Sequence, residues 1–142
     1  MSNPVVSVQG NGKKLIMYGI LDIIMAVVLP IIIYSKVEEG KIEENLETAI
    51  TVLSYLLIFT GTFTISIGIQ YSRTRIYAFE DHIQGQGLVR FNLVSFSLRY
   101  DKVSSVTVNK DKLFINNSGM VYKIGVPSSY AVKIVNYINS RM

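Results

Sequence analysis

The chain has 142 residues, of which 49% are hydrophobic and only 17% are charged, and its formal net charge is +4. So little charge is unusual for a soluble domain, and the length leaves room for a pair of helices and one small domain. The chain has no cysteine and a single histidine. This excludes disulfides, thiolate metal sites and cysteine nucleophiles, and it argues against a zinc centre. We therefore expect neither a metal nor a cofactor.

Two long apolar segments dominate the first half of the chain. Residues 15–34 are interrupted only by Asp22, and residues 48–72 contain no charge. A helix needs about 20 apolar residues to cross ~30 Å of hydrocarbon, so residues 15–72 are predicted to form a transmembrane helical hairpin. Two buried helices of a soluble protein are the alternative, but the roughly 70 residues that follow are too few to cover them and form a core. Pro30 is expected to kink or end the first helix.

The charges of the flanking segments predict the orientation of this hairpin. Residues 1–14, interpreted as an N-terminal tail, carry +2, the short connector at residues 36–47 carries −3, and residues 73–142 carry +6. Because lysine and arginine are retained on the cytoplasmic side, both termini are expected in the cytoplasm and the acidic connector outside. This describes a multi-pass protein of the cytoplasmic (inner) membrane. A cleavable signal peptide is the alternative for the first segment, but no small-x-small cleavage site follows it.

Asp22 lies about 10 Å into the first predicted span, where a carboxylate is costly and needs a partner. In an antiparallel hairpin the cytoplasmic half of the second span lies at the same depth, and its small and hydroxyl side chains allow close approach and hydrogen bonding. The candidate partners are Thr60, Thr62 and Thr64, and the candidate packing residues are Gly61 and Gly68. Asp22 is then either a protonated hydrogen-bonding group within a hairpin or homo-oligomer, or a proton, ion or partner-subunit site.

After Arg73 the hydrophobic pattern changes to the two-residue period of a half-buried strand. The pattern is clearest in residues 94–100, where Val, Phe, Leu and Tyr alternate with Ser and Arg. We expect bends at residues 80–81 and 85–87, and polar turns between the later strands. The predicted strands are residues 75–79, 82–86, 94–100, 103–108, 113–115 and 120–126. Together they predict one antiparallel sheet that curls into a small barrel or sandwich.

The last segment of the chain is expected to form a helix. Pro127 stops the preceding strand, and Ser128 and Ser129 offer a hydroxyl cap. Apolar residues then recur at helical spacing on one face, namely Ala131, Ile134, Val135, Ile138 and Met142. We expect this face to pack across the open end of the sheet, since so small a domain has few other ways to close its core.

A family resemblance rests on the run Tyr100-Asp101-Lys102-Val103, the Ser104-Ser105-Val106 strand after it, and Val126-Pro127-Ser128-Ser129 before the final helix. In these features residues 73–142 resemble the bacterial pleckstrin-homology-like (PH-like) domains, which commonly accompany transmembrane hairpins in small membrane proteins. The resemblance implies a small α+β domain, with a curved antiparallel sheet capped by a C-terminal helix. It carries over no ligand residues, because the bend that is basic in phosphoinositide-binding members is Glu80-Asp81-His82 here.

The sequence favours a non-enzymatic, membrane-anchored module that binds a protein partner or self-assembles at the inner membrane surface. The alternative is an accessory or regulatory subunit of a transport or secretion complex, with Asp22 at a helix contact or at a proton or ion site. We expect no enzyme and no small-molecule substrate, since no convergent catalytic set is found. The lysines and arginines of residues 73–142 are scattered singly, which argues against nucleic acid. Four basic residues, of which two belong to this set, are expected beside the bilayer, where they can meet anionic lipid: Lys13, Lys14, Arg73 and Arg75.

Overall fold

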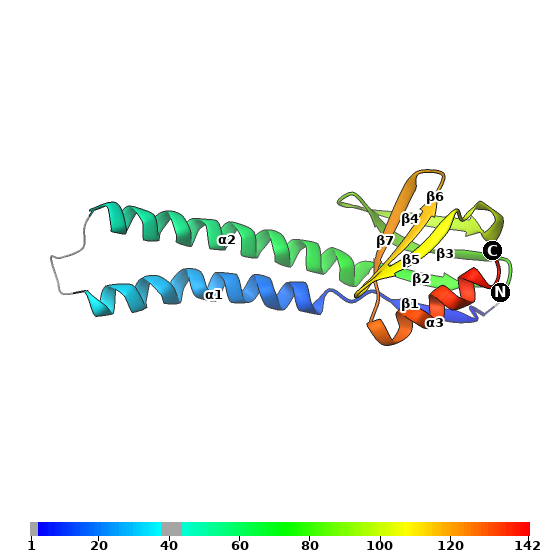
Figure 1. Ribbon diagram of the computed structural model, residues 1–142, viewed down its shortest axis with the longest axis horizontal. Helices are drawn as coiled ribbons and strands as arrows, with labels where there is room; N and C mark the ends of the chain where they lie inside the picture. Colours follow the sequence, from blue (N-terminus) through cyan, green and yellow to red (C-terminus); the bar gives the residue numbers. More distant parts are fainter. Residues whose placement is uncertain (1–2, 38–43) are drawn as a thin grey trace. The chain divides into compact units, whose positions relative to one another are not determined.

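We describe the protein from a computed structural model, of which residues 3–37 and 44–142 are described. The chain forms two compact units. The first, which we name the helical unit, is Lys14–Ile67, and the second, the sheet unit, combines Met1–Lys13 with Gly68–Met142. The sheet unit is therefore made from two pieces of chain, one before and one after the helical unit (Figure 1).

The helical unit is built from two long helices, α1 (Lys13–Lys36) and α2 (Glu44–Arg73). Both are long and apolar enough to cross a membrane, judged by length and composition, and they form the predicted hairpin. In the most apolar 18-residue stretch of each helix, only 11% of the residues are buried. The core helix of a soluble protein would be mostly buried, so these helices present their apolar side chains outward. Because α1 continues through Pro30 to its end at Lys36, this proline does not end the helix.

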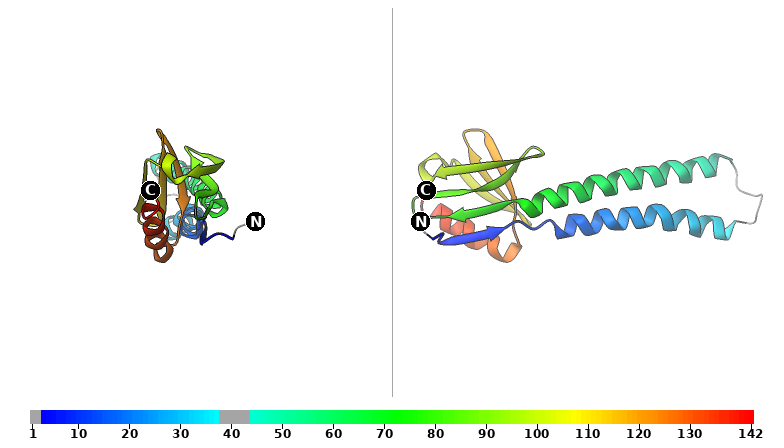
Figure 2. Two further views of the ribbon diagram at one scale, coloured as in Figure 1. Left: turned by 90° about the vertical axis from the view of Figure 1, so that its right-hand side faces the viewer. Right: turned by 180° about the vertical axis from the view of Figure 1, so that it is seen from behind.

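The sheet unit contains one curled antiparallel sheet, with seven strands in the described part of the chain. The strand order is β1-β2-β3-β7-β6-β5, and β4 pairs with β3 outside this path. The strands are β1 (Val6–Gln9), β2 (Arg75–Ala78), β3 (His82–Val89), β4 (Asn92–Arg99), β5 (Ser105–Asn109), β6 (Lys112–Asn117) and β7 (Met120–Gly125). β3 connects the two halves of the sheet, because it pairs with β2, with all of β4, and with β7 through the single pair Leu88↔Lys123 (Figure 2).

The core of the sheet unit lies between the curled sheet and α3 (Ser128–Asn139). The two-residue period of the strands sends alternate side chains inward, and α3 contributes the predicted face of Ala131, Ile134 and Ile138. Met142 was expected on this face, but it lies beyond α3 and is 50% exposed. The largest completely buried apolar side chains are Ile76, Ile83, Leu113, Ile115, Ile124, Val126, Ile134 and Ile138. The predicted fold, a curved antiparallel sheet capped by a C-terminal helix, is confirmed.

The first strand corrects the interpretation of residues 1–14 as a tail. β1 pairs with β2 from Val6↔Ala78 to Gln9↔Arg75, and Val8 is 6% exposed within the core. The short run of valines before α1 is typical of a strand. Its partner strand follows both long helices, so reasoning from neighbouring residues does not predict the pairing.

Two further details of the sheet unit differ from expectation. The predicted bend at residues 85–87 is wrong, because β3 is continuous and the chain turns at Arg90, whose φ is 58°. Gly85 instead permits close strand pairing, since a Cβ there would lie 2.1 Å from the carbonyl oxygen of Arg75. The predicted serine cap of α3 is also wrong. No side-chain hydrogen bond caps the helix, and the carbonyl of Pro127 accepts bonds from the N–H groups of Tyr130 and Ala131.

Candidate functional site

Within the helical unit, α1 and α2 approach closely at Gly19 and Gly61. A Cβ on Gly19 would lie 2.4 Å from the carbonyl oxygen of Gly61, and a Cβ on Gly61 would lie 2.6 Å from the carbonyl oxygen of Gly19. No side chain larger than hydrogen fits at either position, so the two backbones are in contact. Towards the connector the helices instead border an open groove of about 390 Å³ that is lined by Pro30, Tyr34 and Tyr55, among others.

Asp22 lies beside this glycine contact. Its Cβ is 3.2 Å from the position that a Cβ on Gly61 would occupy, and Asp22 is half-buried. The hydroxyls of the expected partners turn away, because Thr60 donates to the carbonyl of Leu56 (2.9 Å) and Thr62 donates to that of Ile58 (2.7 Å). Thr64 is half-buried. Among the described residues we find no hydrogen bond or ion pair to the Asp22 carboxylate, so the Asp–Thr contact stays a prediction.

The junction between α2 and β2 is centred on Thr74, which is completely buried. Its hydroxyl donates to the carbonyl of Tyr71 (2.7 Å) and accepts a hydrogen bond from the N–H of Gly125 (3.1 Å). Its own carbonyl accepts a bond of 2.6 Å from the N–H of Gly10. Thr74 therefore joins the end of α2 to β7 and to the segment before α1, all within the sheet unit.

Glycines allow the segment before α1 to reach this junction. A Cβ on Gly12 would lie 1.7 Å from the carbonyl oxygen of Gly68, the second predicted packing glycine, and the N–H of Gly12 donates to the hydroxyl of Ser72 (3.2 Å). Sequence reasoning missed both Thr74 and this contact. Thr74 lies between two exposed arginines and looks like a surface residue, and the Gly10-Asn11-Gly12 run was the available signal for close backbone approach.

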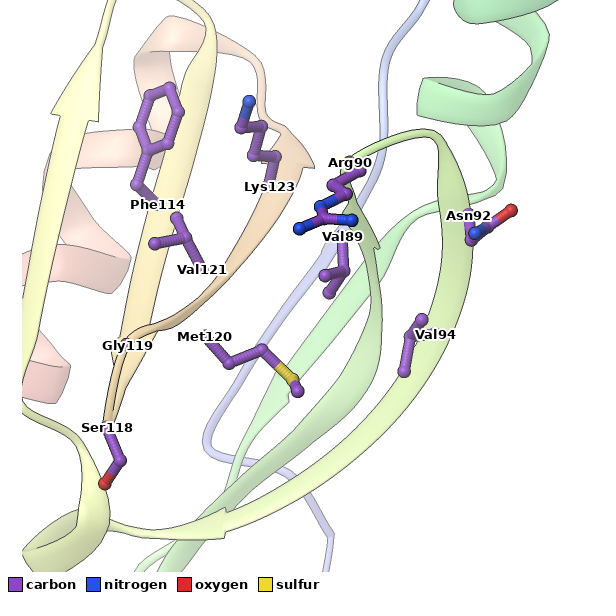
Figure 3. Close-up of a pocket in the computed structure, with 10 residues that line it drawn as sticks. All are labelled: Val89, Arg90, Asn92, Val94, Phe114, Ser118, Gly119, Met120, Val121 and Lys123. Atoms are coloured by element: carbon purple, nitrogen blue, oxygen red, sulfur yellow. The ribbon is translucent and has the colours of Figure 1, made fainter.

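A cleft of about 890 Å³ opens between the β3–β4 and β6–β7 hairpins. It exists because β7 meets β3 through one residue pair only, so the ends of the two hairpins separate. Figure 3 shows Met120 extending into the cleft, with Arg90 and Lys123 together at one end. The remaining apolar lining comes from Val89, Val94, Phe114 and Val121. Apolar walls with two cations suit a ligand that has an apolar body and an anionic group, and the ten lining residues include no nucleophile with a base beside it.

The bend between β2 and β3 contains the Glu80-Asp81-His82 triplet and is formed as predicted. The Asp81 carboxylate lies 2.6 Å from Nδ1 of His82, and this hydrogen bond lowers the pKa of Asp81. The ring of His82 also stacks on Phe79 at a centroid distance of 4.7 Å. These contacts stabilise the conformation of the bend. The Asp81 side chain itself is 83% exposed to water.

Two tyrosine hydroxyls from other parts of the sheet unit donate hydrogen bonds to this bend. The hydroxyls of Tyr100 and Tyr137 donate to the carbonyl of Phe79 over 2.5 Å and 3.3 Å. Burial raises the pKa of Tyr100 to about 12, so the hydroxyl remains protonated at neutral pH and continues to donate. The arrangement is that of a structural anchor, with Tyr100 in the 3₁₀ turn Tyr100–Lys102 and Tyr137 in α3.

Comparison with known proteins supplies no further assignment: no family model, no curated protein and no solved structure matches the chain. The described residues contain no cluster of three or more histidine and acidic residues that could hold a metal ion. Three features therefore remain as functional candidates: the helix contact at Asp22, the cleft, and the exposed basic residues Lys13 and Arg73 beside the junction at Thr74.

Proposed function

We propose that the protein is a non-enzymatic, membrane-anchored interaction module. In this proposal α1 and α2 cross the cytoplasmic membrane as an antiparallel hairpin, and both termini are cytoplasmic. The sheet unit then lies at the inner membrane surface, where it binds a protein partner or assembles with a second copy of the chain. The observation that carries the proposal is the exposed apolar surface of both helices along a membrane-spanning length.

The exposed side chains of these helices support anchoring. Met17, Leu21 and Ile31 of α1 are 63%, 51% and 61% exposed, and Leu56 and Phe59 of α2 are 56% and 70% exposed. A soluble monomer rarely exposes a continuous apolar surface of this size. The basic charge of the sheet unit and the acidic connector agree with the positive-inside rule and set the proposed orientation.

Single cysteines test this topology, because the chain has no native cysteine. We expect Glu47→Cys, at the connector end of α2, to react with a membrane-impermeant thiol reagent in intact cells. Ser118→Cys, in the exposed β6–β7 turn, should react only after permeabilisation. Each variant is the control for the other, since both positions are exposed. The reverse labelling pattern would contradict the cytoplasmic location of the sheet unit.

A second candidate function is that of an accessory or regulatory subunit of a transport or secretion complex. The observation that favours it is Asp22, a half-buried carboxylate in an apolar helix with no bonding partner among the described residues. Such a group in a membrane span is costly and is satisfied by a partner helix, an ion or a proton. A native-mass measurement in mild detergent separates the two candidates, because a homo-oligomer alone favours the module and a mixed complex favours the subunit.

Two substitutions of Asp22 distinguish a hydrogen-bonding group from a proton or ion site. Asp22→Asn keeps size and polarity, so a bonding role predicts unchanged assembly, whereas Asp22→Leu should weaken the hairpin or oligomer by about 0.6 to 2 kcal/mol. If Asp22 titrates in function, the asparagine variant should instead lose the cellular phenotype and keep its assembly, because an amide cannot ionise. Equal tolerance of both variants in both assays would contradict each role.

A further inference from the structure

The end of the sheet unit at which α2 joins it is strongly basic, and we name this surface the helix end. Lys13, Arg73 and Arg75 lie there, and all three are exposed. The β5–β6 hairpin adds Lys110 in its turn and Lys112 at the start of β6. Lys112 Nζ lies 5.1 Å from the ring centre of Tyr71 in the last turns of α2, which places this turn beside the junction.

The acidic residues of the sheet unit are mostly at the opposite end. Glu80 and Asp81 form the β2–β3 bend, four residues along β2 from the junction. Asp101 belongs to the turn that follows β4, and the pairing His82↔Arg99 brings that turn to the same end as the bend. Only Asp111 remains at the helix end. The fold thus brings several basic residues that are distant in the sequence to the helix end, while Arg99 and Lys102 lie at the opposite end with the acidic residues.

The β3–β4 hairpin extends beyond the helix end. β2 begins at Arg75, which pairs with Gln86 of β3, and β3 then continues past that level to Val89. Its turn residues are Arg90 and Phe91, since Val89 pairs with Asn92. At ~3.3 Å per residue, the turn lies up to about 15 Å beyond the start of β2, the end of the sheet at which the last turn of α2 joins it. A short, fully paired hairpin is a rigid support for this turn.

The turn carries one cation and one large apolar ring. Phe91 is 65% exposed, and Arg90 adopts a left-handed conformation with φ of 58°. Apolar side chains such as phenylalanine bury into the boundary between headgroups and acyl chains, and basic side chains near the surface are attracted to anionic headgroups.

We propose that the helix end is a binding face for anionic phospholipid headgroups, and that the β3–β4 turn places Phe91 in the interfacial layer. Arg73, Arg75, Arg90 and Lys110 then contact lipid phosphates, and Phe91 lies among the upper acyl carbons. The inference rests on the proposed membrane anchoring. A bilayer is a better occupant than an acidic protein segment, because the apolar ring and the charges share one surface with the chain's entry into the hairpin.

A single tryptophan reports on the turn, because the chain contains none. Full-length Phe91→Trp is placed in nanodiscs of equal parts phosphatidylcholine and phosphatidylglycerol, whose acyl chains carry bromine as a short-range quencher. Met142→Trp is the control, since Met142 is also exposed (50%) and lies near the opposite end. We expect strong quenching of the F91W reporter, little quenching of M142W, and weaker quenching of F91W in pure phosphatidylcholine.

Charge removal then tests headgroup recognition. Adding Arg90→Gln to the F91W chain should lower the ratio of docked to undocked turn roughly fivefold. In the F91W chain that keeps Arg90, added salt should lower this ratio to a similar extent. Lys102→Gln, an exposed change at the opposite end, should leave the ratio unchanged. Equal quenching of F91W and M142W, or equal quenching in neutral and anionic nanodiscs, would overturn the lipid face. Failure of the chain to enter nanodiscs at all would overturn the membrane anchoring itself.

Discussion

Replacing Ile134 by alanine is expected to lower the free energy of unfolding of the sheet unit by about 2 to 5 kcal/mol. Ile134 is completely buried in α3 against the curled sheet, and the truncation removes three carbon atoms from this packed site. The loss combines the transfer free energy of those atoms with the cost of a cavity. It is a large share of the stability of a domain of this size.

Val132→Ala is the matched control, because Val132 belongs to the same helix but is 62% exposed. We expect a change within about 0.5 kcal/mol for this variant. Pulse proteolysis of the full-length chain across a urea series measures both. Equal stability of the two variants would mean that α3 does not close the core.

The second large effect is expected where the two long helices meet. Gly61→Leu or Gly19→Leu puts a branched side chain where even a Cβ would lie 2.6 Å or 2.4 Å from the opposing carbonyl oxygen. The helices must separate or rotate, which typically costs about 1–3 kcal/mol and sometimes more. Any gain from leucine's better helix propensity, about 1 kcal/mol over glycine, is smaller than this cost.

Ser66→Leu provides the control for the hairpin, since Ser66 lies on an exposed face of α2 and the change adds the same apolar side chain. Melting temperatures in mild detergent should fall by several degrees for the glycine variants and remain near the parent value for the control. Unchanged melting of Gly61→Leu would contradict the backbone contact at Gly19 and Gly61.

The parts of the fold that sequence reasoning predicts are those with a local signal. The two helices follow from long apolar stretches that hold at most one charge, and β4 to β7 follow from a two-residue alternation with polar turns between the strands. The parts that it misses depend on partners distant in the sequence. β1 pairs only with β2, beyond both helices, and the need for Gly85 is set by the backbone of β2 and not by a turn.

The candidate site shows the same division between local and distant effects. Helix geometry alone predicts that Asp22 lies level with Gly61, and the structure places the two side by side. Helix geometry does not predict where the threonine hydroxyls point, because a hydroxyl within a helix can bond the carbonyl one turn earlier. Thr60 and Thr62 do this. The collection of basic side chains at the helix end depends on three separate turns, so no sequence window contains it.

The position of β1 has a consequence for how the protein is made. Gln9 emerges from the ribosome long before its partner Arg75, and at ~5–20 residues per second the delay is roughly 3 to 13 s. During this interval the two apolar helices are synthesised while β1 has no strand to pair with. The sheet is therefore completed after the hairpin has left the ribosome. A newly made chain must keep a four-residue strand unpaired, and its shortness limits the edge that it offers to other chains during that wait.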